Sequence, residues 1–243
     1  MIRRAAFFLF LLAQFHGFAQ EQLITVGMQY KPIFASKFFG AGEVSASDSN
    51  FTVSVKPTWG HSYGMIIRRG FTKTISLETG INYVRRRYGM SCTDTDSGFT
   101  DKSDFSIISY EIPTQMLIYV RLGERFYMNN AFGLSLTAFA SDVESHGTDQ
   151  RFFQYSRMTT NFLSAALIAN VGFEYRSKKA GFYYLGASFH KPVKNIANSY
   201  ATYNQDPFRS HTAFFDLTGT YLTVDLRYFF HEAPVKPKKK KKS

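Results

Sequence analysis

The sequence predicts an all-β fold, an eight-stranded antiparallel transmembrane β-barrel in which the strands follow one another in an up-and-down meander. Eight segments alternate apolar and polar residues with a period of two, which is typical of strands with two different faces. The connections between these segments are alternately short and long. The first residues also have the pattern of an export signal.

Composition excludes several other classes of protein. The 243 residues include 29 Lys and Arg against 18 Asp and Glu, a formal net charge of +11, but much of the excess lies at Arg3, Arg4, Lys236 and 238–242. The central region is therefore not basic enough to indicate a nucleic-acid partner. One Cys cannot form an internal disulfide framework or a cysteine zinc site. No apolar run reaches the roughly 18 residues of a membrane helix, and 26 Phe with 15 Tyr favour strands.

The first 19 residues are expected to be a signal peptide. Arg3 and Arg4 precede an apolar stretch over residues 5–13, and Gly17 and Ala19 are small residues at positions −3 and −1 of a cleavage site. A membrane anchor is the alternative, and the apolar stretch is short for one. We therefore expect the mature chain to work outside the cytoplasm.

The alternation predicts strands at 24–31, 51–68, 75–83, 106–121, 126–138, 163–176, 182–190 and 222–230. In the sixth segment Leu167, Val171 and Phe173 fall on one face, whereas Asn170 and Glu174 fall on the other. Aromatic residues collect near segment ends, as the interfacial girdles of a membrane barrel require. Pro57 and Pro113 cannot donate to a strand ladder and predict local bulges.

The connections predict the two ends of the barrel. Short turns rich in Gly, Lys and Arg occupy 69–74, 122–125 and 177–181, and long segments rich in Ser, Asp, Asn and Thr occupy 32–50, 86–105, 139–161 and 191–212. Short periplasmic turns and long extracellular loops are typical of outer-membrane barrels. A secreted β-sandwich also alternates, but nothing in that fold requires this rhythm. We therefore predict a barrel over 20–230 and a disordered, Lys-rich periplasmic tail over 231–243.

Polar residues on the inward faces predict a network inside the barrel. Its predicted members are Lys56, Arg68, Glu78, Arg86, Glu111, Gln115, Arg121, Glu174, Asp225 and Arg227. Side chains fill the interior of an eight-stranded barrel, and charges of both signs can pair there. The main interpretation is a structural plug, and the alternative is a gated polar pathway.

No catalytic, cofactor or metal site is expected. Four histidines fall near the predicted rim or in a long loop: His61, His190, His211 and His146. None of them lies in the H-x-S pattern of a lipid A deacylase. One loop resembles part of a calcium site: Asp94, Asp96, Gly98 and Asp101. Phe105 stands where the bidentate Glu is needed, so we interpret the segment as a solvated loop.

The fourth segment carries a resemblance to a known family. Tyr110, Glu111, Ile112 and Pro113, followed by Tyr119 and Arg121, resemble the Y-x-E-I-P strand of PorT-like outer-membrane β-barrels of the Bacteroidota. Related stretches are 77–83 (LETGINY), 172–175 (GFEY) and 226–230 (LRYFF). The resemblance covers most of the mature chain. It implies a Gram-negative cell envelope, the outer membrane and no catalytic residues to carry over. The chain departs from many such barrels by continuing past Phe230.

The leading expectation is a non-enzymatic outer-membrane barrel that presents surface loops for structural, adhesion or partner-docking roles. An accessory component of a secretion or transport machinery is the first alternative, which the resemblance suggests. A lipid-modifying outer-membrane enzyme is the second. The expected partners are outer-membrane lipid, envelope or secretion proteins and, for the tail, anionic periplasmic surfaces.

Overall fold

The computed structural model describes residues 24–34, 40, 42–159 and 163–231. The predicted signal peptide lies outside these residues, as does the predicted tail except for His231. The strands are β1 (Ile24–Phe34), β2 (Val44–Asp48), β3 (Phe51–Gly70), β4 (Ile75–Asp94), β5 (Phe99–Arg121), β6 (Phe126–Phe139), β7 (Val143–His146), β8 (Phe152–Met158), β9 (Ser164–Arg176), β10 (Phe182–Pro192), β11 (Ala197–Asp206), β12 (Arg209–Leu217) and β13 (Tyr221–Phe229). Within the described ranges, no helix is long and apolar enough to cross a membrane.

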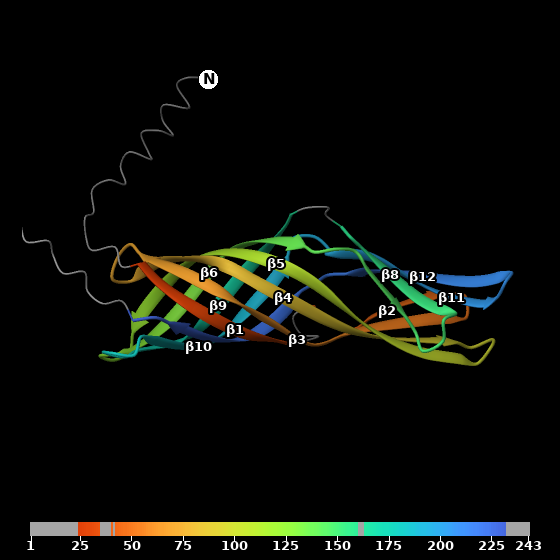
Figure 1. Ribbon diagram of the computed structural model, residues 1–243, viewed down its shortest axis with the longest axis horizontal. Coiled ribbons are helices and arrows are strands. Elements are labelled where there is room, and N and C mark those ends of the chain that lie inside the picture. The colour runs from red at the N-terminus through yellow and green to blue at the C-terminus, as the bar shows by residue number, and fades with distance from the viewer. Residues whose placement is uncertain (1–23, 35–39, 41, 160–162, 232–243) are drawn as a thin grey trace, which may run out of the picture.

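Eight of these strands close into an antiparallel barrel in the order β1-β13-β10-β9-β6-β5-β4-β3, and pairing of β1 with β3 completes the ring. The turns β3–β4, β5–β6 and β9–β10 lie at one end, together with the start of β1 and the end of β13 (Figure 1). We call this end the turn end. The eight barrel strands correspond to the eight predicted segments, which confirms the predicted fold class.

The long connections are not irregular loops, because five further strands form within them and β4 and β5 extend well beyond the predicted segments. The strands β12, β11, β8 and β7 form a second sheet in that order. This sheet packs on β2 and on residues 51–58, 87–94 and 99–108 of β3, β4 and β5. We call the two-layered unit the distal sandwich, and it forms the end of the molecule opposite the turn end (Figure 1).

Side chains from both layers fill the distal sandwich with an apolar core. Phe51 of β3 contacts the rings of Phe152 on β8 and Tyr203 on β11, with centroid distances of 6.3 and 5.9 Å. Polar contacts join the layers at their edges, where the Thr212 backbone N–H donates to Asp48 (2.9 Å) and the Ser103 hydroxyl donates to the carbonyl of His146 (2.8 Å). Burial of about twenty apolar side chains stabilises the unit.

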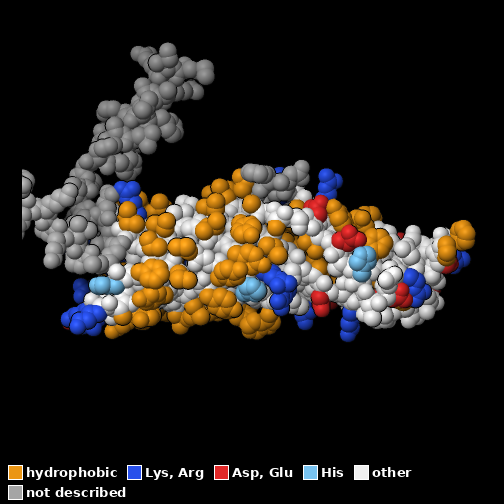
Figure 2. Space-filling view, in the orientation of Figure 1, with side chains coloured by type: hydrophobic (Ala, Val, Ile, Leu, Met, Phe, Trp, Pro, Cys, Tyr) orange, Lys and Arg blue, Asp and Glu red, His pale blue; other side chains and the backbone are white. Residues whose placement is uncertain are grey.

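The polarity of the inward and outward faces reverses along the strands that run from the barrel into the distal sandwich. On β4 the inward side chains change from Ser76, Glu78, Asn82 and Arg86 in the barrel to Tyr88, Met90 and Cys92 in the distal sandwich. The outward side chains change in the opposite sense, from Leu77, Ile81 and Tyr83 to Arg85, Arg87 and Ser91. The surface shows the same change, because apolar side chains cover the half toward the turn end and polar ones dominate the other half (Figure 2).

A bulge in β3 lies at this boundary. The β3–β4 register shifts between Thr58 and His61, next to Pro57. The inward positions of β3 are odd-numbered before the bulge, as at Phe51 and Val55, and even-numbered after it. The bulge predicted at Pro57 is therefore confirmed. The one predicted at Pro113 is wrong, because β5 keeps one register with β6 through that residue.

Two facing glycines make room for an aromatic ring inside the barrel. Gly172 of β9 pairs with Gly186 of β10, and a Cβ on either would overlap the hydroxyl of Tyr184. The Tyr184 hydroxyl donates to the Asn170 amide oxygen at 2.6 Å. The small residues thus allow a large polar ring to fill part of the lumen.

Candidate functional site: the polar lumen and its rim

The lumen contains most of the residues that the sequence placed there. Eight of the ten are buried inside the barrel: Arg68, Glu78, Arg86, Glu111, Gln115, Glu174, Asp225 and Arg227. They come from β3, β4, β5, β9 and β13, and the period of two directs each of them inward. The seven charged members fall into two clusters along the barrel axis.

The cluster nearer the turn end is a chain of alternating charges. Glu78 accepts hydrogen bonds from Arg227 (2.5 Å) and from Arg68 (3.0 Å), and Arg68 also pairs with Glu174 (2.5 Å). Arg176 pairs with the second oxygen of Glu174 (2.7 Å). The chain therefore crosses from β13 to β9 through the middle of the barrel.

Asp225 extends this cluster on β13. Its carboxylate pairs with Arg227 (2.5 Å) and Lys31 (3.4 Å) and accepts hydrogen bonds from the hydroxyls of Ser188 (2.6 Å) and Thr223 (2.5 Å). Each buried carboxylate faces more than one donor, which is the arrangement that makes a buried charge tolerable.

The second cluster lies in the part of the lumen next to the apolar core of the distal sandwich. Glu111 accepts hydrogen bonds from Arg86 (2.7 Å) and from the hydroxyl of Tyr221 (2.9 Å). The His190 ring stacks on Tyr221 with centroids 4.4 Å apart, and Nδ1 of His190 lies 3.1 Å from the Tyr221 hydroxyl. Arg86 also donates to Ser109 (2.9 Å). The apolar core of the distal sandwich thus covers this cluster on one side, and the first cluster borders it on the side toward the turn end.

Two predicted lumen residues lie elsewhere. Lys56 is exposed on the outer face of the distal sandwich, because the β3 bulge reverses which residues face inward. Arg121 is exposed at the turn end, where its Nε donates to the Gly123 carbonyl at 3.0 Å. Both predictions extended one alternation across a point where the strand bulges or ends.

One wall of the lumen is less completely paired. Within the described ranges, several buried polar atoms on β5 and β6 have no hydrogen-bond partner: the Gln115 amide oxygen, the Tyr119 hydroxyl, both side-chain polar atoms of Asn129 and the Ser135 hydroxyl. Buried groups of this kind are commonly hydrated. These side chains carry no formal charge, so this wall of the lumen is polar but has no charged group that could hold an ion.

Sequence reasoning did not include four polar side chains that complete the clusters: Tyr184, Ser188, Tyr221 and Thr223. All four occupy inward positions on β10 and β13, so the period of two contained the signal. Residue type alone does not identify them, because Tyr183 and Tyr228 on the same two strands face outward.

The other three histidines lie on strands outside the lumen, and Asp101 of the acidic segment is held by hydrogen bonds. His61 lies on the outer face of β3, His146 on β7 and His211 on β12, where His211 Nδ1 is 4.0 Å from Asp48. Asp101 accepts backbone N–H groups from Asp149, Lys102 and Thr148 at 2.8–3.1 Å. Burial would raise the pKa of Asp101, but these donors outweigh it and lower the pKa. Among the described residues, no three His, Cys, Asp or Glu side chains are grouped to hold a metal ion.

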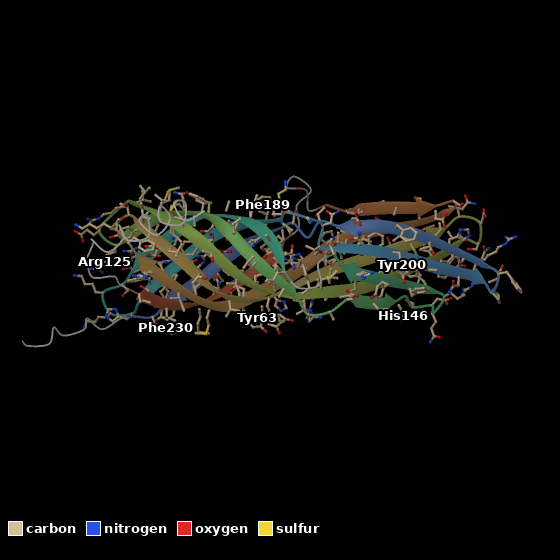
Figure 3. All side chains as sticks on the ribbon, turned by 90° about the horizontal axis from the view of Figure 1, so that it is seen from above. Tyr63, Arg125, His146, Phe189, Tyr200 and Phe230 are labelled. Carbon is tan, nitrogen blue, oxygen red and sulfur yellow. The ribbon has the colours of Figure 1, made fainter. Side chains whose placement is uncertain are left out.

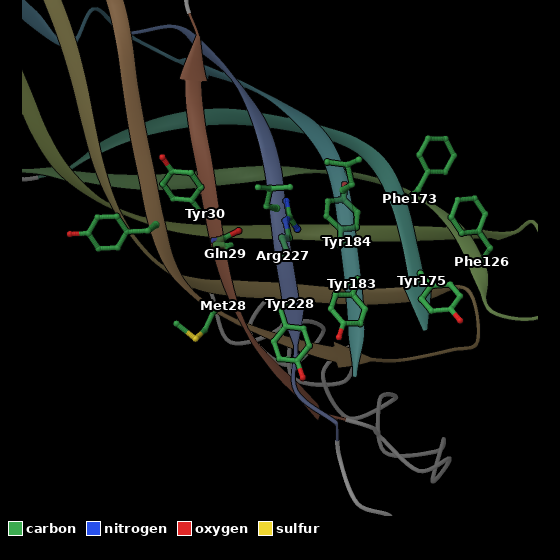
Figure 4. A pocket seen from close by; sticks show the side chains of 13 residues that line it. Met28, Gln29, Tyr30, Phe126, Phe173, Tyr175, Tyr183, Tyr184, Arg227 and Tyr228 are labelled. Atoms are coloured by element: carbon green, nitrogen blue, oxygen red, sulfur yellow. The ribbon is translucent and has the colours of Figure 1, made fainter. Parts of the chain in front are cut away.

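The outer surface of the barrel has a shallow groove of about 850 Å³ near the turn end (Figure 4). Met28, Leu185 and Leu226 contribute apolar side chains, and the rings of Tyr183 and Tyr228 project beside them. The groove belongs to the apolar band of the barrel, so acyl chains are the chemistry it suits. Aromatic side chains with polar tips are common where such a band meets water.

Comparisons with known proteins agree on the fold. No family model and no curated protein matches the chain. The outer membrane protein OprG from Pseudomonas aeruginosa is similar at a TM-score of 0.50 and 11% identity, over 86% of this chain and 96% of that one. The likeness shows the fold alone. The outer membrane protease OmpT from Escherichia coli (TM-score 0.44, 10% identity, 88% of this chain and 98% of that one) and the attachment invasion locus protein Ail of Yersinia pestis (0.34, 9%, 86% and 100%) also match, less closely.

Proposed function

We propose that this chain is an outer-membrane barrel without an open pore, which carries the distal sandwich outside the cell as a non-enzymatic platform for structural support, adhesion or docking of a partner protein. The exchange of polarity along β4 carries the proposal. An apolar exterior around a charged interior suits lipid, and a polar exterior around an apolar core suits water.

The height of the apolar band supports membrane insertion. Tyr110 and Val120 are outward residues ten positions apart on β5. At about 3.4 Å per residue and a tilt of roughly 40°, they are separated by about 26 Å along the barrel axis. An outer-membrane barrel presents an apolar band of about 25 Å. The distal sandwich begins beyond this band, so it lies in water.

Two successive obstructions support the absence of a pore. Ion-paired side chains cross the lumen, and the apolar core of the distal sandwich covers the end farther from the turns. Ions that passed the ion-paired side chains would then meet an apolar core that excludes water. This argument favours the plug over the gated pathway.

The surface of the distal sandwich supports a docking role. Phe208, at the tip of the β11–β12 hairpin, is 96% exposed, and Phe214 on β12 is 74% exposed. Figure 3 shows Tyr200 and His146 on the distal sandwich as well, far from Arg125 and Phe230 at the turn end. Exposed aromatic side chains are frequent in protein interfaces.

Cysteine labelling in intact cells tests the orientation. Burial raises the pKa of the native Cys92 thiol to about 12, so its reaction with maleimide is slow. Gln205→Cys, in the distal sandwich, should react with a membrane-impermeant maleimide in intact cells. Glu124→Cys, in a short turn, should react only after the outer membrane is permeabilised. The reverse pattern, or equal labelling of both, would contradict the proposal.

A further inference from the structure

A row of tyrosines marks the edge of the apolar band on one side of the barrel. Tyr30, Tyr63, Tyr83 and Tyr110 are paired in register across β1, β3, β4 and β5. The rings of Tyr63 and Tyr83 are 4.9 Å apart, and those of Tyr83 and Tyr110 are 6.0 Å apart. Tyr63 lies on the barrel, between the turn end marked by Arg125 and the distal sandwich marked by Tyr200 and His146 (Figure 3). Tyrosines prefer the headgroup level of a membrane.

Basic side chains stand immediately beyond this row. His61 pairs in register with Arg85, and Arg87 follows on the same outward face of β4. The His61 ring lies 6.2 Å from Tyr63 and 6.3 Å from Tyr83. Figure 2 shows Lys or Arg and His side chains together where the apolar band ends.

These two arginines differ from those in the lumen, because neither makes an ion pair with a described residue. The lumen arginines Arg68, Arg86 and Arg227 all contact carboxylates, whereas among the described residues no carboxylate lies within ion-pair distance of Arg85 or Arg87. In the next outward row Lys56 and Asp104 flank Gly89, so the charge of that row is balanced. The in-register neighbours of Arg85 and Arg87 on β3 and β5 are His61, Ile108, Thr58 and Ser106, so no acidic side chain in these two rows balances their charge.

We infer that Arg85, Arg87 and His61 bind a phosphate group of a phosphorylated glycolipid in the outer leaflet. Guanidinium groups donate to phosphate in a planar, bidentate fashion, and two arginines on the same face of a strand can donate to one group. The tyrosine rings below offer apolar faces to the sugar and the acyl chains. This inference rests on the proposed function, because it requires the apolar band to lie in the membrane.

Binding can be measured on the purified full-length barrel in dodecylmaltoside micelles. Trp59 is the only tryptophan, is 69% exposed and packs on Phe34 with ring centroids 4.4 Å apart, two residues before His61. Its fluorescence should respond to diphosphoryl lipid A, and co-elution of the lipid in gel filtration gives a second, independent readout. The wild-type protein should bind diphosphoryl lipid A saturably and enzymatically dephosphorylated lipid A at least tenfold more weakly.

The variant Arg85→Gln/Arg87→Gln should bind diphosphoryl lipid A at least tenfold more weakly than the wild type. Lys178→Gln/Lys179→Gln removes the same charge from an exposed turn at the opposite end and should bind as the wild type does. The single variant Arg87→Gln, at an exposed position, gives a milder test if the double variant does not fold.

Equal affinity for the two lipids, or equal loss in the Lys178/Lys179 control, would overturn the inference. Inorganic phosphate that bound as tightly as the lipid would overturn it too, since the site would then serve a free ion. Heat-modifiable migration in SDS gels separates these results from failure of the proposed function. A wild-type chain that never migrates as a folded barrel would contradict the membrane barrel itself.

Discussion

Replacing Glu78 by Gln tests whether the lumen is held by paired charges. The Glu78 side chain is 1% exposed and accepts hydrogen bonds from both Arg68 and Arg227. Gln keeps the size of the side chain but removes its charge, so two buried guanidinium groups lose one of their carboxylates. Removing one partner of a buried ion pair costs roughly 3–5 kcal/mol. We expect a loss of that size in the free energy of unfolding.

Urea unfolding of the barrel in lipid vesicles, followed by tryptophan fluorescence, measures this loss. Glu124→Gln, in the exposed β5–β6 turn, is the matched control and should change the free energy of unfolding by no more than about 0.5 kcal/mol. In the double variant Glu78→Gln/Arg227→Gln the two losses should be less than additive, because the pair is removed together. A loss below about 1 kcal/mol for Glu78→Gln would refute the plug, since it would mean that water screens these charges.

Three further outcomes follow from local geometry. Hydrogen bonds from the Met158 backbone N–H and the Tyr155 hydroxyl lower the pKa of Asp142. Its carboxylate therefore stabilises the distal sandwich above a pH of about 4, and this stabilisation is lost as the pH falls through the folded-state pKa. The stability gap between wild type and Asp142→Asn should be present at pH 7 and should narrow as the pH falls from 4 toward 2 in urea titrations. Gly186→Ala should destabilise the barrel by roughly 1–3 kcal/mol in the same assay, because the added Cβ would overlap the Tyr184 hydroxyl; wild-type stability would mean that this ring moves freely. His190→Ala should leave lipid A acylation unchanged by mass spectrometry, and a mass shift that depends on His190 would contradict the non-enzymatic proposal.

The barrel could be predicted from the sequence because its signal is local. Each strand alternates along its own length, as in 163–176, and the short turns between strands carry Gly and Lys. Burial of Arg68, Glu78 and Arg227 follows from the same alternation, since only one face of a barrel strand meets the lumen. Which carboxylate each arginine contacts depends on the shear of the barrel, which sequence alone does not reveal.

The distal sandwich could not be predicted in the same way. Its apolar residues are spaced among Ser, Thr and Asp, and they become a core only when four separate connections meet. Phe51, Phe152 and Tyr203 contact one another although they are far apart in the chain. The inward position predicted for Lys56 is wrong for a related reason, because a bulge changes the inward face of β3 and Pro57 is its only signal in the sequence.

The depth of β4 in the membrane is the most direct test of the account. Spin labels on single cysteines at the outward positions Leu77, Ile81, Ser91 and Thr93, in a Cys92→Ser background, can be probed with oxygen and with a polar nickel chelate in lipid vesicles. Labels at Leu77 and Ile81 should be accessible to oxygen and shielded from nickel, and those at Ser91 and Thr93 should show the opposite. Equal accessibility at Ile81 and Ser91 would contradict the claim that the membrane ends where the polarity of the strand reverses.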